Sequence, residues 1–210
     1  MNLESIGFPL FKYQAVELPE NPLQVCFKRG DRAFGNIYLW NTFSLQKMPS
    51  VWGACFYTED WRFGRFLKDV KVAQLYLPRF KYVIQPDFSV YYDQPLIDQW
   101  WRTWTGKRIA ATWQKNGIKV IPSLVAGSRD NYEAAVFGWQ PHQVFAVQVQ
   151  ANDHNPTQDE TDAWTITKAL HDFDPPFVLV YATKDRLEKL GLNDPRLKII
   201  NSKISALRAF

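Results

Sequence analysis

Residues 144–181, VFAVQVQANDHNPTQDETDAWTITKALHDFDPPFVLVY, contain a strand, a helix and a second strand in succession. The two apolar runs at 144–149 and 177–181 are rich in β-branched and aromatic residues, which favour strands. Between them, Thr157 is placed to cap a helix over 158–172, with Glu160 at the capping-box position. Buried strands that alternate with helices are typical of a parallel sheet with right-handed crossovers.

The same alternation extends along the rest of the chain. We expect further strands at 51–57, 80–85, 118–124 and 198–204, and helices at 61–70, 96–115, 128–138 and 183–190. The predicted fold is therefore α/β, a mainly parallel sheet of about five to seven strands with alternating helices, either open or forming a partial barrel. The chain has 210 residues, fewer than the roughly 250 that a complete eightfold barrel typically needs.

The first 50 residues differ in composition from those that follow. They are rich in proline and polar residues, with short apolar runs at 25–27 and 36–40 that predict a hairpin or two short strands. We therefore expect an irregular, β-rich N-terminal arm over residues 1–50 and one compact α/β domain over residues 51–210.

The composition excludes several classes of protein. With 46% hydrophobic and 22% charged residues, the chain can bury a core and is not disordered. It has no apolar run of eighteen residues and no signal-like N-terminus, so we expect a cytoplasmic protein with no membrane partner. Two cysteines exclude a disulfide framework and a four-cysteine zinc site. The spacing of the three histidines and the missing G-x-x-x-x-G-K-[ST] motif exclude zincins and P-loop ATPases.

Positive charge and aromatic rings gather in the middle of the chain. Residues 62–119 hold 11 basic and four acidic residues, whereas the segments on either side are slightly acidic. Cations neutralise phosphates and rings stack on bases, so this composition predicts nucleic-acid binding. The candidate residues are Arg62, Arg65, Trp101, Arg102, Trp104, Lys107 and Arg108. The alternative is a solvated helix face, with lysine and arginine stems lying over a tryptophan-rich core.

Polar side chains follow the predicted strands at the point where each strand ends. Glu59 and Asp60 follow the strand at 51–57, Asp87 and Ser89 follow the next strand, and Gln148 ends the strand at 144–149. In parallel α/β folds these ends meet in one crevice. Asp87, Asp60 and Ser89 are therefore candidate catalytic residues, and Asp60, Glu59 and Asp87 are candidate ligands for Mg²⁺ or Mn²⁺. Alternatively, the acids cap the following helices, for which Asp60 is well placed.

Several ordered blocks resemble a known family. Residues 56–63, FYTEDWRF, are similar to an H-F-F-x-D-D-x-R-F block, and residues 86–91, PDFSVY, followed by Pro95, to a P-D-F-S-x-Y…P block. Residues 111–122, ATWQKNGIKVIP, are similar to an A-x-W-Q-x-x-G-I-x-V-I-P block. Together they resemble the family catalogued as domain of unknown function 4417, whose members occur in bacteria, archaea, phages and other mobile elements. The resemblance implies a phage or plasmid origin and names no activity.

The match to these blocks is uneven. Asp60, Asp87, Phe88 and Ser89 agree with them, whereas Glu59 replaces the first acid of the D-D pair and residues 102–105, RTWT, replace an N-x-Y-R motif. Three hypotheses remain open: a nucleic-acid-binding protein of a mobile element, a metal-dependent hydrolase of the phosphoester or nuclease type, and a protein-binding accessory that uses the aromatic residues of the arm.

Overall fold

The structure is a computed structural model that describes residues 12–16, 23–26, 52–57, 70–149 and 155–200. Within these residues the chain alternates between strands and helices, as the sequence predicts. The elements of the first half are β1 (Leu23–Cys26), β2 (Trp52–Cys55), α3 (Val70–Tyr76), η4 (Leu77–Arg79), β3 (Tyr82–Ile84), α4 (Leu96–Lys115) and β4 (Val120–Ile121). Those of the second half are η5 (Arg129–Asn131), α5 (Tyr132–Val136), β5 (Phe145–Gln148), α6 (Pro156–Phe173), β6 (Val178–Tyr181), α7 (Lys184–Lys189) and β7 (Leu197–Ile199).

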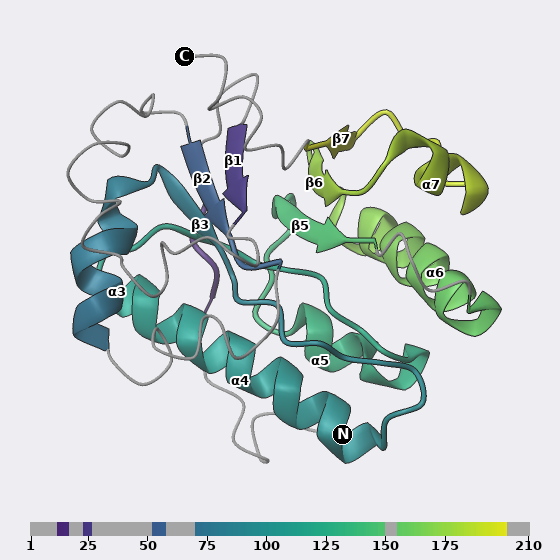
Figure 1. Cartoon of the computed structure of the whole chain (residues 1–210), viewed down its shortest axis with the longest axis horizontal. Coiled ribbons are helices and arrows are strands. Elements are labelled where there is room, and N and C mark those ends of the chain that lie inside the picture. Colours follow the sequence, from purple (N-terminus) through teal and green to yellow (C-terminus); the bar gives the residue numbers. More distant parts are fainter. Residues whose placement is uncertain (1–11, 17–22, 27–51, 58–69, 150–154, 201–210) are drawn as a thin grey trace.

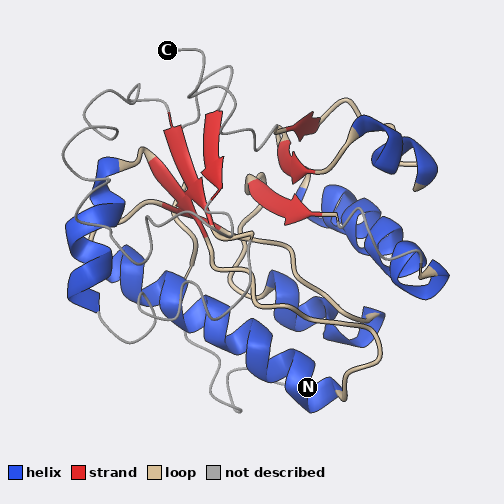
Figure 2. Cartoon of the chain, in the orientation of Figure 1, coloured by secondary structure: helices blue, strands red, loops and turns tan. Residues whose placement is uncertain are grey.

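The strands of the described residues form two parallel sheets. The first has the order β1-β2-β3-β4 and the second the order β5-β6-β7, so each strand lies beside its neighbour in the sequence. All pairings are parallel, with Val83 opposite Val120 in the first sheet and Val147 opposite Val180 in the second. Helices α3, α4, α5 and α6 follow one another around the outside of the strands (Figure 1; Figure 2).

The described residues do not show one sheet of five to seven strands, but a parallel sheet of four strands and another of three. Among these residues the two sheets are linked by a parallel bridge between Ser123 and Ala146. At this bridge the Ala146 N–H donates to the Pro122 carbonyl at 2.9 Å, and the Leu124 N–H donates to the Ala146 carbonyl at 2.7 Å. Because Pro122 has no N–H to donate, it interrupts the strand predicted over 118–124, and β4 ends at Ile121.

One hydrophobic core nevertheless extends across both sheets. Val83 and Val120 of the first sheet and Phe145 and Val178 of the second belong to the same buried cluster as Trp113 of α4. Burying such side chains stabilises each by about 1.5–3 kcal/mol relative to leaving it in water. The strands between the helices are therefore held mainly by apolar packing on both faces.

The helices agree with the sequence to different degrees. The helix predicted over 96–115 is confirmed as α4, and its chain reverses at Gly117, which has a φ of +79°. The predicted cap of α6 is wrong: Asn155, not Thr157, accepts hydrogen bonds from the N–H groups of Thr157 and Gln158. Pro156 then occupies the first helical position, where its fixed φ suits a helix and its missing N–H costs nothing.

Two further expectations concern the N-terminal part and membranes. The short strand predicted at 25–27 is present as β1, and it pairs with β2. The run at 36–40 and the predicted helix at 61–70, apart from Val70, lie outside the described residues. The domain boundary at residue 50 stays a prediction. None of the helices in the described part of the chain combines the length and the apolar character needed to cross a membrane.

Candidate functional site

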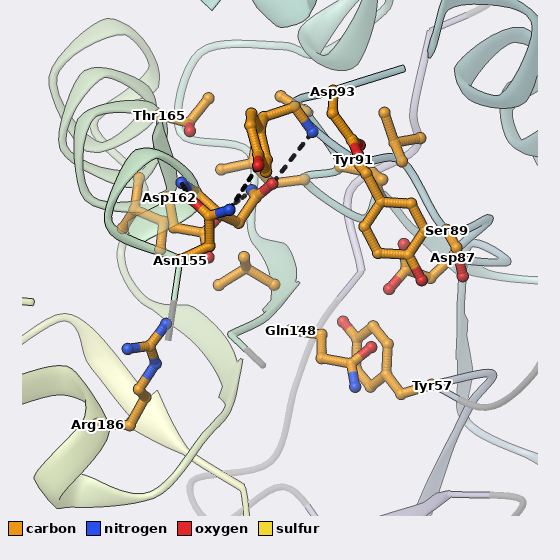
Figure 3. A pocket seen from close by; sticks show the side chains of 18 of the residues that line it. Tyr57, Asp87, Ser89, Tyr91, Asp93, Gln148, Asn155, Asp162, Thr165 and Arg186 are labelled. Atoms are coloured by element: carbon orange, nitrogen blue, oxygen red, sulfur yellow. Dashed lines mark hydrogen bonds between the residues drawn. The ribbon is translucent and has the colours of Figure 1, made fainter. Parts of the chain in front are cut away.

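A pocket of about 750 Å³ lies at the carboxyl ends of strands from both sheets (Figure 3). Tyr57 lies two residues after β2, Asp87 three residues after β3, Leu124 three residues after β4, and Gln148 is the last residue of β5. The carboxyl edge is where parallel α/β proteins place their ligands, because all the loops that follow the strands meet there. The pocket therefore lies where the sequence predicts a site.

The wall that follows the first sheet carries carboxylate and hydroxyl groups. Asp87 and Ser89 are half-buried in this wall, and Tyr91 and Asp93 continue it towards α4 (Figure 3). Beneath them Tyr57 is only 6% exposed. Burial raises the pKa of Tyr57 well above its usual value, and the negative charge of Asp87 raises it further. The Tyr57 hydroxyl is therefore held neutral beside an anion, in the state in which it can donate a hydrogen bond.

The Tyr57 hydroxyl is buried without a partner. The neighbouring Ser123 hydroxyl opposes the rise in the Tyr57 pKa, but within the described residues neither of these two buried hydroxyls completes a hydrogen bond. A buried polar group of this kind is costly, on the order of 1–3 kcal/mol. The Tyr57 ring itself is well held, since it stacks on Tyr181 of β6 with ring centroids 5.4 Å apart. This contact joins the ends of the two sheets at the pocket.

The opposite wall comes from α6 and α7. Burial raises the pKa of Asp162 to about 6, although the hydrogen bond from Gln158 and the charge of Arg186 act in the other direction. The Gln158 Nε2 donates to Asp162 Oδ1 at 2.7 Å. Arg186 also lines the pocket, but its guanidinium is bound by both carboxylate oxygens of Asp159. Asp162 is therefore a carboxyl group that changes its charge near neutral pH.

The rim of the pocket joins the two walls. Asn155 Nδ2 donates to the Tyr92 hydroxyl at 2.6 Å, and the Tyr92 N–H donates to Gln158 Oε1 at 3.3 Å. Nearby, a Cβ atom placed on Gly127 would lie 2.6 Å from the Tyr91 carbonyl oxygen. Only glycine allows the two loops to pack this closely. The loop after β3 is thus held both to the N-terminal turn of α6 and to the loop after β4.

The predicted site residues are only partly brought together. Asp87 and Ser89 line the pocket, as does Gln148, whereas Glu59 and Asp60 lie outside the described residues. The pairing of Asp87 with these two acids around a metal therefore stays a prediction. Over the described ranges, no three histidine, cysteine, aspartate or glutamate side chains lie close enough together to hold a metal ion.

Sequence reasoning missed most of the second wall. The helix predicted over 158–172 also carries Asp162, whose carboxyl group lines the pocket and is not among the predicted site residues. A signal was present, since Gln158, Asp162 and Thr165 recur at helical spacing and so share one face of α6. Thr183, two residues after β6, caps α7 by accepting from the Arg186 N–H.

The candidate nucleic-acid residues divide into three groups. Arg62 and Arg65 lie outside the described residues. On α4, Trp101 is 63% exposed and stacks on Trp104 with ring centroids 4.9 Å apart. The Arg108 guanidinium lies 5.1 Å from the Trp104 ring centroid. Arg102, which follows Trp101 in the sequence, is half-buried.

Lys107 does not belong to this surface. Its side chain is fully buried, its ammonium donates to the Phe137 carbonyl at 2.8 Å, and it lies 5.5 Å from the Tyr13 ring centroid. Burial lowers the pKa of Lys107 to about 7. A phosphate group outside the protein cannot reach this ammonium, so the prediction that Lys107 binds nucleic acid is wrong for this conformation.

Comparisons with known proteins connect the chain to phages. It is 22% identical over 144 residues to the Gene 1 protein of Mycobacterium phage L5, an alignment that covers 67% of this chain and 62% of that protein. It is 27% identical over 103 residues to the Gene 1 protein of Mycobacterium phage D29, covering 47% of this chain and 37% of that protein. The chain thus spans about three fifths of the first relative and just over a third of the second. No solved structure matches it.

The match to a family model covers most of the described residues. The model described as "Domain of unknown function (DUF4417)" matches residues 31–194, which include β2 to β6, α7 and every residue of the pocket wall named above. The chain therefore belongs to the DUF4417 family, which the blocks around Asp60, Asp87 and Ala111 predict.

Proposed function

We propose that the pocket is the active site of a hydrolase in which Asp87 and Asp162 transfer protons. The observation that carries this proposal is the placement of two carboxyl groups on opposite walls of one pocket (Figure 3). Their surroundings differ: Asp162 has a raised pKa, while Asp87 acts as an anion on Tyr57. Two carboxyl groups whose environments separate their protonation states are suited to act as acid and base.

Each carboxyl group has one role in the proposed reaction. The Asp87 carboxylate removes a proton from a water molecule as the water oxygen bonds to the electrophilic atom of the substrate. The Asp162 acid gives its proton to the leaving oxygen as the bond to that oxygen breaks. Water is thereby added across the bond, and one further proton transfer restores both groups. The burial of Asp162 supports the acid role, because it keeps the proton bound at a higher pH.

The experiment is a hydrolysis assay of the purified full chain on p-nitrophenyl glycosides, p-nitrophenyl acetate and bis-p-nitrophenyl phosphate. We expect activity on one class of substrate, and a loss of about 100-fold or more in kcat for Asp87→Asn and for Asp162→Asn. Asp130→Asn is the matched control, since Asp130 is exposed and does not line the pocket. Full activity in both pocket variants contradicts the proposal.

The metal-dependent form of the hydrolase is tested in the same assay. In that form Asp87 binds Mg²⁺ or Mn²⁺ together with Glu59 and Asp60, and the metal activates the water. Activity that requires added metal and disappears with EDTA supports it, particularly if Asp60→Asn abolishes the metal response. Activity that is the same with EDTA assigns the chemistry to Asp87 and Asp162 alone.

A second candidate function is nucleic-acid binding by the outer face of α4. The observation in its favour is the exposed stack of Trp101 on Trp104, with Arg108 over the second ring. Such rings offer faces to bases, and the arginine offers charge to phosphates. We expect labelled single-stranded DNA or RNA to bind with an affinity that falls with salt, and Trp101→Ala with Arg108→Ala to weaken it about tenfold or more.

The control for this second function is Lys119→Ala, which removes an exposed positive charge from the loop after α4 and leaves the stack intact. If Lys119→Ala loses as much binding as the double variant, the interaction is general charge attraction and does not depend on the stack. Binding that is independent of salt, or that is unchanged in the double variant, contradicts a role for this face.

A further inference from the structure

We propose that the pocket takes a neutral, hydroxyl-rich ligand of the carbohydrate class. This inference rests on the proposed function, because it names the substrate of the same site. It depends on three features of the pocket: the sign of the charge of its described residues, the kinds of hydrogen-bonding group in its walls, and the buried Tyr57 hydroxyl, which has no partner among the residues that the structure describes.

The charge of the pocket disfavours anions. Among the described residues that line it, Asp87, Asp93 and Asp162 carry carboxyl groups and Arg186 is the single basic residue. The Arg186 guanidinium is already bound by Asp159 through two hydrogen bonds, so its charge is largely offset. A phosphate or carboxylate ligand would meet net negative charge here and would need a bound cation to offset it.

The walls present both donors and acceptors of hydrogen bonds. Tyr57 and Ser89 carry hydroxyl groups, and Gln148 carries a side-chain amide, alongside the carboxylates of the two walls (Figure 3). Hydroxyl and amide groups can donate and accept at once. A sugar hydroxyl has the same dual capacity, whereas an ammonium group only donates and would leave the donors of these walls unmatched. The mixture of groups therefore favours a polyhydroxyl ligand over an organic cation.

The Tyr57 hydroxyl supplies a specific anchor point. It is neutral, it is enclosed by the protein, and it has no hydrogen-bond partner among the described residues, while its ring is fixed by the stack on Tyr181. In Figure 3 the hydroxyl end of Tyr57 points towards the space between the two walls. The hydroxyl is closed to solvent in this conformation, so a ligand hydroxyl would satisfy it after the side chains that cover it move apart.

Two carboxyl groups are also what glycoside hydrolysis requires. One acts as an acid on the glycosidic oxygen and the other as a base or nucleophile on the opposite side of the sugar ring. Asp162 and Asp87 lie on opposite walls, and Tyr57 and Gln148 lie below Asp87 in the view of Figure 3. The groups that are proposed to transfer protons therefore lie on either side of the space in which the ligand would bind.

The test measures binding to the full chain by isothermal titration calorimetry and ligand-observed NMR. The probes are maltotriose, cellobiose and chitotriose as neutral saccharides, with inorganic phosphate, uridine monophosphate and spermidine as charged comparisons. We expect at least one saccharide to bind more tightly than all three charged probes. Tyr57→Phe should weaken that binding by about three- to tenfold, which is the effect of losing one hydrogen bond.

Tyr57→Phe is suited to this test because the hydroxyl it removes has no hydrogen-bond partner among the described residues. Its melting temperature should stay the same or rise, so weaker binding cannot be attributed to a damaged fold. Asp130→Asn, at an exposed residue that does not line the pocket, is the matched control and should leave saccharide binding unchanged. Saccharide binding that is equal in Tyr57→Phe and the wild type overturns the proposal.

The outcomes separate this inference from the proposed function. Tighter binding of phosphate, uridine monophosphate or spermidine than of every saccharide overturns the ligand class. If hydrolysis of p-nitrophenyl acetate or bis-p-nitrophenyl phosphate still depends on Asp87 and Asp162, the hydrolase proposal survives that result. If no probe binds and neither carboxyl variant changes any activity, both proposals fail together.

Discussion

Arg186 of α7 and Asp159 of α6 form an ion pair with two hydrogen bonds at the edge of the pocket. Nη1 of Arg186 donates to Asp159 Oδ2 at 2.9 Å, and Nη2 donates to Oδ1. The side chains are only 7% and 17% exposed. The hydrogen bonds to Asp159 raise the pKa of Arg186 further above its usual value. The pair links α6 to α7 directly, and so it fixes one wall of the pocket.

Removing one member of this pair should be costly. We expect Arg186→Met to lower the free energy of unfolding by about 2–4 kcal/mol, because Asp159 is left as a largely buried carboxylate without its cation. The double variant Arg186→Met with Asp159→Leu should recover most of the loss. Urea denaturation followed by tryptophan fluorescence measures both, and a single variant as stable as the wild type contradicts the structural role of the pair.

Lys107 predicts how stability depends on pH. Its pKa falls from 10.5 when unfolded to about 7 when folded, so between these values the unfolded chain binds more protons and stability should rise with pH. The rise is at most about 1.4 kcal/mol per pH unit. Because Lys107→Met removes the group, the stability of the wild type relative to this variant should increase from pH 7 to 9.5. Denaturant melts of both proteins at several pH values measure the difference, and a constant difference contradicts the burial of the charge.

The close packing of Gly127 on Tyr91 predicts a change in the pocket. We expect Gly127→Ala to displace the loop after β3, because its Cβ would lie 2.6 Å and 2.7 Å from the backbone oxygen and carbon of Tyr91. The cost to stability should be about 1–3 kcal/mol, and ligand binding should weaken. Gly117→Ala is the comparison. Its Cβ has open space but its φ is +79°, so it should lose stability and keep ligand binding.

Asp162 predicts the pH dependence of the proposed reaction. As the proton donor it must be protonated, and its pKa is about 6. The rate should therefore fall about tenfold per pH unit above pH 6. Asp162→Asn should lack this alkaline limb, whatever activity remains. A pH–rate profile of the wild type that rises between pH 6 and 8 assigns the donor to another group.

The parts of the fold that repeat locally could be predicted from the sequence. Twenty residues of helical pattern between Pro95 and Gly117 give α4 its observed ends, because proline fixes φ before the first turn and glycine permits the positive φ after the last. The division into two sheets could not be predicted in this way. It depends on Pro122, which the prediction treats as part of a continuous strand although proline cannot donate to the next strand.

The part of the candidate site that directly follows strands could be predicted from the sequence, whereas the part that comes from helices could not. Asp87, Ser89 and Gln148 follow strands directly, so the rule that parallel strands end at one edge finds them. Asp162 and Arg186 reach the pocket from helices, and a charged residue on a helix is usually solvated. The helical spacing of Gln158, Asp162 and Thr165 shows that they share one face of α6, but the sequence does not show that this face borders the pocket.

The core residues and the pocket residues lie in different parts of the chain, and this has a consequence for evolution. The strands carry the shared hydrophobic core, whereas the residues that line the pocket lie mostly in the loops and helices that follow the strands. Substitutions in those loops can change the ligand while leaving the core intact. Relatives that share the arrangement of strands can therefore diverge in substrate, and the identity of the residue at each strand end is a better guide to shared chemistry than overall similarity.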